Sequence, residues 1–209
     1  MTYTAAKIGM KQSKNIKIAV TGGIGSGKST VCKIIAESGY PVFSCDEEYK
    51  LLLNGGSLPK ELAENFGEDI LNGDGSVNRK ILSGKIFGDR KKLEQLNKIT
   101  HPKIFSSLFK KSEGIEGIVF FEVPLLFEGD YQNLFDGVIV ILRNINERIN
   151  GIVKRDKLTE EEVLVRLNNQ INYEKYDFTK YYVIHNDVNL NNLCDITREI
   201  LSKITKEYK

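Results

Sequence analysis

Eight consecutive residues, from Gly22 to Ser29, have the composition of a phosphate-binding loop. They read GGIGSGKS and match GxxxxGK[ST] at every fixed position. Glycines let the backbone turn successive N–H groups toward phosphate oxygens, and a helix beginning near Lys28 adds its positive dipole end. The Lys28 ammonium suits the β- and γ-phosphates, and the Ser29 hydroxyl is a ligand for Mg²⁺. The residues expected to bind the nucleotide phosphates are Gly22, Gly23, Ile24, Gly25, Ser26, Gly27, Lys28, Ser29 and Thr30.

Three acidic residues follow predicted strands. Asp46 comes just after the strand at 41–44, Glu122 directly follows the strand at 117–121, and Glu128 lies in the loop beyond. Ligands of open α/β sheets bind outside the carboxyl ends of the strands. Asp46 is therefore a candidate to act on an incoming hydroxyl, or alternatively the N-cap of the next helix. Glu122 is either a metal-shell residue or an ordinary surface acid, and Glu128 is a candidate for meeting the substrate.

Basic residues gather on a predicted helix at 144–156. Arg148, Lys154 and Arg155 lie on it, followed by Asp156. Phosphoryl transfer needs positive charge over the departing group, and a mobile helix-loop-helix can supply it and exclude water. The alternative is a solvated helix face with i,i+4 ion pairs. The two histidines, His101 beside Pro102 and His185, are more typical of capping or packing than of catalysis.

The hydrophobic pattern predicts a parallel α/β sheet with helices on both faces. Strands are expected at 16–21, 41–44, 117–121, 137–142 and 182–184. Helices are expected at 28–38, 144–156, 159–172 and 189–206, and Thr159 with Glu162 has the spacing of a capping box. The stretch 46–112 is instead mostly helical, with segments at 46–54, 59–66, 78–88 and 90–112 and a turn at 72–75. This stretch is interpreted as a substrate-binding insertion.

Composition excludes several other classes. The chain has 209 residues, 41% of them hydrophobic, and its 30 basic and 28 acidic residues leave a net charge of +2. Charges of both signs are interspersed, so nucleic acid is not an expected partner. No apolar run approaches the roughly 20 residues of a membrane span, so no membrane partner is expected. Three cysteines far apart favour a reducing, cytoplasmic setting over a disulfide or zinc scaffold.

The ordered motifs resemble those of the dephospho-coenzyme A kinases. They comprise TGGIGSGKST at 21–30, Asp46, His101-Pro102, VPLLFE at 123–128, and Arg155-Asp156 followed by Arg166 and Gln170. The resemblance implies a P-loop kinase with a five-stranded parallel core, a helical CoA-binding domain and a lid. Its members transfer the γ-phosphoryl group of ATP, with Mg²⁺, to the ribose 3′-hydroxyl of dephospho-CoA, which completes coenzyme A synthesis.

The resemblance also implies a domain plan and roles for residues. A polar tail at 1–15 precedes one kinase domain at 16–209, with its core at 16–45 and 113–209, the insertion at about 46–112 and the lid at about 144–172. A monomer or weak homo-oligomer is expected. Asp46 matches the family's general base, Arg155 matches the lid arginine, and Lys28 completes the catalytic set. The residues expected to bind the acceptor are Asp46, Lys50, Arg79, His101 and Glu128.

The sequence departs from the family pattern at several positions. Ser44-Cys45-Asp46 replaces Asp-Ala-Asp, and Lys50 replaces an arginine, which loses bidentate phosphate contact. Gly151 replaces a basic residue, for which Arg148 is the expected substitute in nucleotide binding. Two alternatives stay open: another small-acceptor kinase, such as a nucleoside monophosphate kinase, or a weakly catalytic nucleotide-binding module. A GTPase is disfavoured because no NKxD motif is present.

Overall fold

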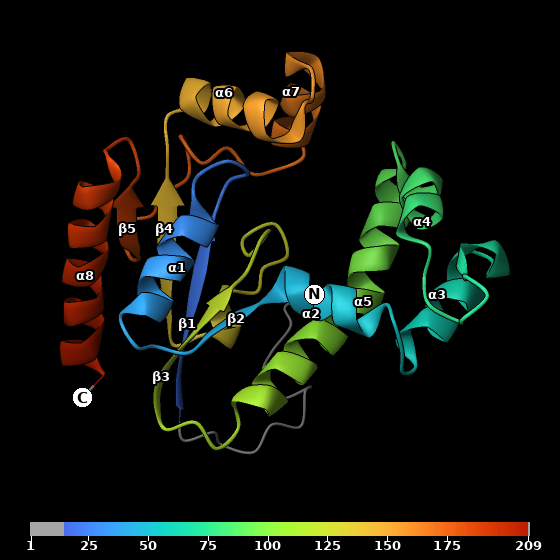
Figure 1. Ribbon diagram of the computed structural model, residues 1–209, viewed down its shortest axis with the longest axis horizontal. Coiled ribbons are helices and arrows are strands. Elements are labelled where there is room, and N and C mark those ends of the chain that lie inside the picture. The colour runs from blue at the N-terminus through green and yellow to red at the C-terminus, as the bar shows by residue number, and fades with distance from the viewer. Residues whose placement is uncertain (1–14, 209) are drawn as a thin grey trace. The chain divides into compact units, whose positions relative to one another are not determined.

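The computed structural model describes residues 15–208, which form two compact units (Figure 1). One unit contains the described residues up to Ser44 together with those from Glu113 onward, and the other is Cys45–Ser112. The predicted polar tail lies outside the described residues except for Asn15, which opens the first strand. Among residues 15–208, no helix is both long and apolar enough to cross a bilayer.

The first unit is built on a five-stranded sheet with the order β2-β3-β1-β4-β5. Its strands are β1 Asn15–Gly22, β2 Val42–Ser44, β3 Gly117–Glu122, β4 Gly137–Leu142 and β5 Tyr182–His185. All neighbouring strands are parallel, which confirms the predicted sheet. Because the carboxyl ends share one edge, the register sets Glu122 opposite Val20 of β1 and Ser44 of β2 at that edge.

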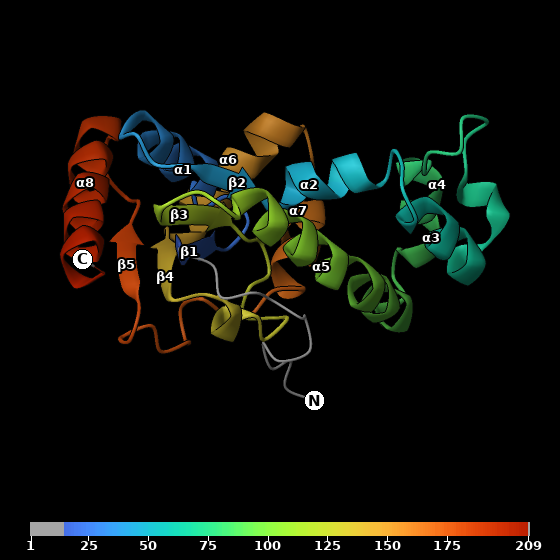
Figure 2. The same ribbon diagram turned by 90° about the horizontal axis from the view of Figure 1, so that it is seen from below.

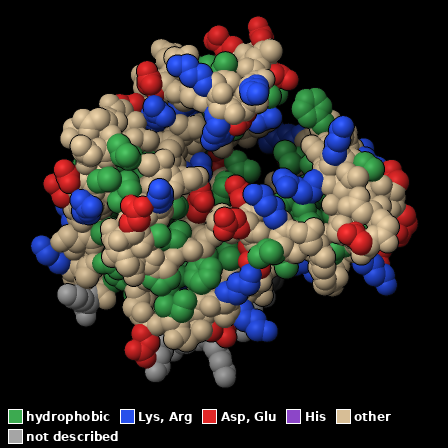
Figure 3. All heavy atoms as spheres, viewed as in Figure 1, with side chains coloured by type: hydrophobic (Ala, Val, Ile, Leu, Met, Phe, Trp, Pro, Cys, Tyr) green, Lys and Arg blue, Asp and Glu red, His purple; other side chains and the backbone are tan. Residues whose placement is uncertain are grey.

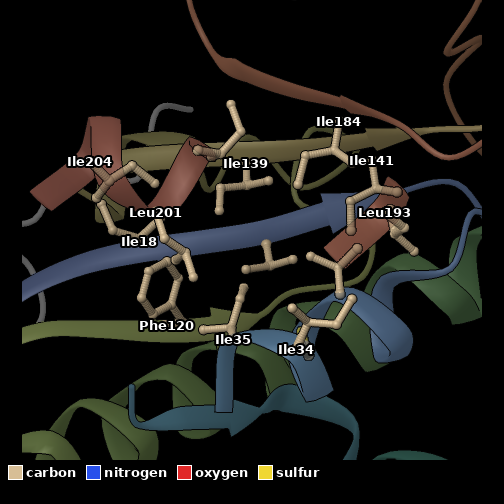
Figure 4. Close-up of a cluster of buried hydrophobic side chains, with 14 residues drawn as sticks. Ile18, Ile34, Ile35, Phe120, Ile139, Ile141, Ile184, Leu193, Leu201 and Ile204 are labelled. Atoms are coloured by element: carbon tan, nitrogen blue, oxygen red, sulfur yellow. The ribbon is translucent and has the colours of Figure 1, made fainter. Parts of the chain in front are cut away.

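Two helices cover one face of this sheet and bury its apolar side chains. These are α1 Lys28–Glu37 and α8 Leu190–Glu207. Alternate strand residues point into the layer between sheet and helices, as the two-residue period of a strand requires (Figure 4). The cluster includes Ile18, Ile34, Ile35, Phe120, Ile139, Ile141, Ile184, Leu193, Leu201 and Ile204. The layer fixes the two elements that flank the phosphate-binding loop, since β1 enters the loop and α1 leaves it.

Residues 144–172, predicted to form a lid and called the lid segment below, carry α6 Ile145–Asp156 and α7 Glu160–Asn168, which lie beyond the carboxyl end of β4 (Figure 1). Thr159 and Glu162 form the predicted capping box. The helix predicted for 159–172 ends earlier, at Asn168. The reason is that the next residues make other bonds: Gln170 accepts from the Ile24 N–H and the Ile171 N–H donates to Glu128.

The second unit is helical (Figure 2). It has an apolar core of its own. Its elements are α2 Cys45–Leu52, α3 Leu58–Phe66, the short 3₁₀ helix η2 Glu68–Ile70, α4 Arg79–Ile86 and α5 Arg90–Ser112. Leu53, Leu62, Phe66 and Ile70 are among its buried residues. The segment predicted at 90–112 is the single helix α5, and His101 and Pro102 lie inside it. Burial of Leu96 and Thr100 on the preceding turns explains why the helix continues despite the missing proline N–H.

A buried carboxylate joins two helices of this unit. Glu48 of α2 is only 4% exposed. Its Oε1 accepts from the Ser107 hydroxyl of α5 at 2.6 Å, and its Oε2 pairs with the Lys111 ammonium, also on α5. Because Glu48 lies two residues after Asp46 in the same helix, these bonds also hold the backbone that carries Asp46.

Replacing Glu48 should therefore destabilise the protein. In Glu48→Gln, the Lys111 ammonium loses its charged partner, and the side chain at position 48 stays buried. We expect the free energy of unfolding to fall by about 1–3 kcal/mol. Chemical denaturation followed by far-UV circular dichroism measures it. Glu47→Gln changes an exposed neighbour on the same turn and should leave stability within about 0.5 kcal/mol of the wild type. Equal losses in the two variants would contradict the role given to Glu48.

Candidate active site

The turn between β1 and α1 lies at the carboxyl edge of the sheet and has the conformation of an anion cradle. Gly25 and Gly27 have φ angles of 76° and 96°, which other residues adopt only with strain. Gly27 is the N-cap of α1, and no side chain caps the helix. A Cβ at Gly27 would also lie 2.2 Å from the Asn186 Nδ2. The helix N terminus is thus presented to an anion without a competing side chain.

The polar side chains of the loop meet partners at its two ends. The Lys28 ammonium donates to the carbonyl oxygens of Gly22 at 2.9 Å and Gly23 at 3.2 Å. The Ser29 hydroxyl donates to Glu122 Oε1 at 3.2 Å. A hydroxyl beside a carboxylate is a set of hard oxygen donors that suits Mg²⁺. The structure therefore brings Glu122 to the residue expected to hold the metal.

Arg148 of α6 lies directly against the loop. The residue is 6% exposed, and its Nε donates to the Ile24 carbonyl oxygen at 2.8 Å. Its guanidinium occupies the space beside Gly23, where a Cβ would lie 2.3 Å from Nη2. Burial lowers the pKa of the Arg148 guanidinium, while Tyr173 and Glu174 oppose this shift. Arg148, which was predicted to contact the nucleotide, therefore lies at the loop. One of its N–H groups is bonded to a main-chain carbonyl oxygen.

Arg155 and Glu128 have partners within their own unit. Arg155 donates to both carboxylate oxygens of Asp156, at 2.7 and 2.9 Å, and Asp156 also lies 3.9 Å from Arg166. This ion pair raises the pKa of Arg155 and lowers that of Asp156. Glu128, predicted to meet the substrate, accepts from the Ile171 N–H at 3.0 Å through one carboxylate oxygen, Oε1. Its carboxylate therefore fixes the segment that leaves α7.

A cavity of about 580 Å³ opens beside the phosphate-binding loop. The carboxyl ends of β4 and β5 contribute Leu142 and His185 to its wall, and the loop contributes Gly23 and Ser26. The segment 169–181 adds an aromatic wall comprising Tyr173, Tyr176, Phe178 and Tyr181. Sequence analysis did not predict this cavity because no motif covers residues 171–181, although their density of aromatic residues was a usable signal.

The remaining predicted residues lie in the second unit. Asp46 is exposed in the first turn of α2, which begins at Cys45, so the N-cap interpretation of Asp46 is wrong. Lys50 follows one turn later and is also exposed. Arg79 opens α4 after the true N-cap, Asn78, and borders a hollow of about 430 Å³ that Tyr49 also lines. His101 lies partly buried on α5, with its ring 6.4 Å from that of Phe105.

Charge is distributed as the composition predicts. On the face seen in Figure 3, basic and acidic side chains are interspersed. Among residues 15–208, no group of three or more His, Cys, Asp or Glu side chains is arranged to hold a metal ion. Such a group is not required for Mg²⁺, which commonly keeps water and phosphate ligands.

Comparisons with known proteins agree with this geometry. The family model for dephospho-CoA kinase matches residues 16–192. The chain belongs to the dephospho-CoA kinase family. The dephospho-CoA kinase of Listeria monocytogenes is 36% identical over 178 residues, which cover 83% of this chain and 89% of that protein.

Two crystal structures extend the likeness to the fold. TT1252 from Thermus thermophilus superposes with a TM-score of 0.78 at 29% identity, covering 92% of this chain and 100% of the other. The dephospho-CoA kinase from Campylobacter jejuni gives a TM-score of 0.62 at 26% identity, covering 93% and 100%. The family predicted from the motifs and the predicted kinase fold are both confirmed.

Burial of His101 should make the stability of this family member depend on acidity. Burial lowers the pKa of His101 to about 4 from an ordinary value of 6.5. As pH falls below 6.5, the unfolded chain binds the proton first, so stability is lost between about pH 6.5 and 4, by at most about 1.4 kcal/mol per pH unit. Above pH 6.5 this histidine contributes no pH dependence.

The melting temperatures at pH 7.5 and 4.5 measure this effect. We expect a smaller decrease in His101→Gln than in the wild type, because glutamine takes up no proton. His185→Gln alters the exposed histidine of β5 and should keep the wild-type decrease. If the wild type and His101→Gln lose the same number of degrees, burial of His101 does not govern the acid response.

Proposed function

We propose that this chain transfers the γ-phosphoryl group of ATP to the ribose 3′-hydroxyl of dephospho-CoA, giving coenzyme A and ADP. The observation that carries the proposal is the family match over residues 16–192, together with a complete phosphate-binding loop at the edge of the parallel sheet. A loop of this kind alone would fit many acceptors, so the family match decides between them.

The nucleotide site follows from the first unit. The amides from Gly25 to Ser29 receive the β- and γ-phosphates, and the Lys28 ammonium turns from the Gly22 and Gly23 carbonyls to the phosphates. The nucleoside occupies the neighbouring cavity of about 580 Å³, where aromatic side chains offer a surface for a base. Ser29 and Glu122 fit Mg²⁺, which would supply charge neutralisation on the bridging phosphate oxygens.

The chemical step is an in-line displacement. The 3′-oxygen forms a bond to the γ-phosphorus, the bond from that phosphorus to the β–γ bridging oxygen breaks, and ADP leaves. The hydroxyl becomes acidic as the new bond forms, so the Asp46 carboxylate can accept the proton late. Asp46 suits this role because its side chain is exposed. It also lies two residues after Ser44, the last residue of β2, which is paired with Glu122 of β3.

The lid segment supplies charge and excludes water. Arg155 is 63% exposed in its pair with Asp156, so its guanidinium can exchange that carboxylate for the transferring phosphoryl group. An arginine in this position contributes roughly 10³-fold or more to turnover. The acceptor is held by Lys50, Arg79 and His101 of the second unit.

We place the enzyme in the cytoplasm as a monomer or weak homo-oligomer. Within residues 15–208, Cys32, Cys45 and Cys194 form no disulfide, which fits a reducing compartment.

A coupled ADP-release assay tests the proposed acceptor. With ATP and Mg²⁺, we expect turnover with dephospho-CoA to exceed that with AMP, adenosine or pantetheine by at least about 10²-fold, since only dephospho-CoA carries both the ribose hydroxyl and the pantetheine arm. Lys28→Ala measures the background. A preference for AMP would favour a nucleoside monophosphate kinase, and no turnover with any acceptor would favour a nucleotide-binding module.

Asp46→Asn should separate binding from chemistry. Asparagine keeps the shape of the side chain but accepts no proton, so we expect turnover to fall by at least about 10²-fold. The Kd of an ATP analogue, measured by calorimetry, should stay within twofold because the nucleotide site lies in the other unit. Glu47→Asn changes the adjacent exposed carboxylate and should retain turnover. Near-wild-type turnover in Asp46→Asn would show that another group takes the proton.

A further inference from the structure

Ile24 of the phosphate-binding loop is held by the lid segment at both of its main-chain groups. Its N–H donates to Gln170 Oε1 at 2.8 Å, just beyond the end of α7. Its carbonyl oxygen accepts from Arg148 Nε of α6, also at 2.8 Å. The Ile24 side chain packs against the apolar cluster of the lid segment, formed by Ile149, Ile152 and Val163. One residue of the loop is therefore fastened to both helices of the lid segment.

The neighbouring glycines show how closely α6 is seated on the loop. A Cβ at Gly23 would overlap the Arg148 guanidinium at 2.3 Å, and a Cβ at Gly25 would lie 2.9 Å from Ile152 Cδ1. Contact with α6 thus favours glycine at both positions, and the positive φ of Gly25 adds a backbone requirement there. The first half of the loop packs on the lid segment, while the second half leads into α1.

The segment that carries Gln170 is itself fixed. The following residue, Ile171, donates its N–H to Glu128 Oε1 at 3.0 Å. Glu128 belongs to the connection between β3 and β4, so this bond attaches the end of the lid segment to the body of the unit. Gln170 is consequently presented to Ile24 from a segment with little freedom of its own.

We propose that Gln170 and Arg148 are positioning residues, which hold the peptide groups before and after Ile24 so that the amides that follow face the phosphates. Through these bonds, the conformation of the loop also depends on α6 and on the residues that follow α7 in the lid segment. Without the Gln170 oxygen, the Ile24 N–H is left without its acceptor and the peptide relaxes toward other orientations, which costs binding of the triphosphate. The inference rests on the proposed function only in taking ATP as the ligand of the loop.

Gln170→Leu removes the acceptor while keeping a side chain of similar size. Hydrogen–deuterium exchange of the Ile24 amide should become at least about tenfold faster, because an unpaired N–H loses its protection. The Kd of a non-hydrolysable ATP analogue should rise about tenfold, while the Kd of dephospho-CoA changes less than twofold. KM for ATP should rise with little change in kcat, as expected when ground-state and transition-state binding are lost together.

Gln132→Leu is the matched control. Gln132 donates to Asp130 in the connection between β3 and β4 and makes no hydrogen bond to the loop among those of residues 15–208. Its substitution should leave both Kd values unchanged. Gln170→Glu restores an acceptor oxygen and should restore slow exchange at Ile24, although its charge opposes the triphosphate.

A double-variant cycle tests whether both residues act through Ile24. Arg148→Met releases the Ile24 carbonyl and should also weaken the ATP analogue by about tenfold. If the two contacts jointly hold Ile24, the Kd of the ATP analogue in the double variant should rise by clearly less than the product of the two single rises. Arg198→Met on α8 removes an exposed arginine, paired with Asp195, as a control for the loss of one positive charge.

Two results would overturn the proposal. One is unchanged exchange at Ile24 in Gln170→Leu. The other is an equal rise in both Kd values together with a lower melting temperature of the unliganded protein, which would make Gln170 a residue of general stability. Failure of the proposed function would look different: the wild type would not phosphorylate dephospho-CoA, while exchange at Ile24 and affinity for the ATP analogue would still respond to Gln170.

Discussion

A triphosphate can be gripped by main-chain N–H groups only where a chain leaves a rigid strand, bends tightly and enters a helix with no side chain in the way. β1 and α1 meet this condition because both are fixed in one apolar layer, with Ile18 of the strand and Ile34 and Ile35 of the helix packed together. Glycines provide the bend, and Gly27 leaves the helix end uncapped. Every other element of the first unit is placed relative to that short turn.

The parallel arrangement of the strands concentrates chemistry around the turn. Since all five strands end at the same edge, Glu122 of β3 reaches Ser29 from the neighbouring strand without any special loop. The same edge receives α6 after β4 and the aromatic segment before β5. One side of the loop can thus face the charged phosphates of a nucleotide, and the other side can face its base.

Much of this was visible in the sequence because the signals were local. The β-branched run at 16–21 and the loop motif after it fixed the first strand, the loop and the helix, and Thr159 with Glu162 marked the start of α7. Contacts between distant segments were not visible. Nothing near Gln170 signals its bond to Ile24, which lies 146 residues earlier. The bond between Glu128 and the Ile171 N–H likewise depends on tertiary packing and could not be predicted from the sequence.

The helical insertion enters the first unit at Ser44–Cys45 and returns at Ser112–Glu113, and Leu62, Phe66 and Ile70 give it a core of its own. Only two peptide bonds connect it to the sheet. A segment attached in this way can accumulate substitutions, or be exchanged for another, with little disturbance to the strands. Ser44, the last residue of β2, directly precedes the insertion, and Lys50 lies in its first helix. A change in the insertion can therefore alter what it binds while the strands and the phosphate-binding loop keep their packing.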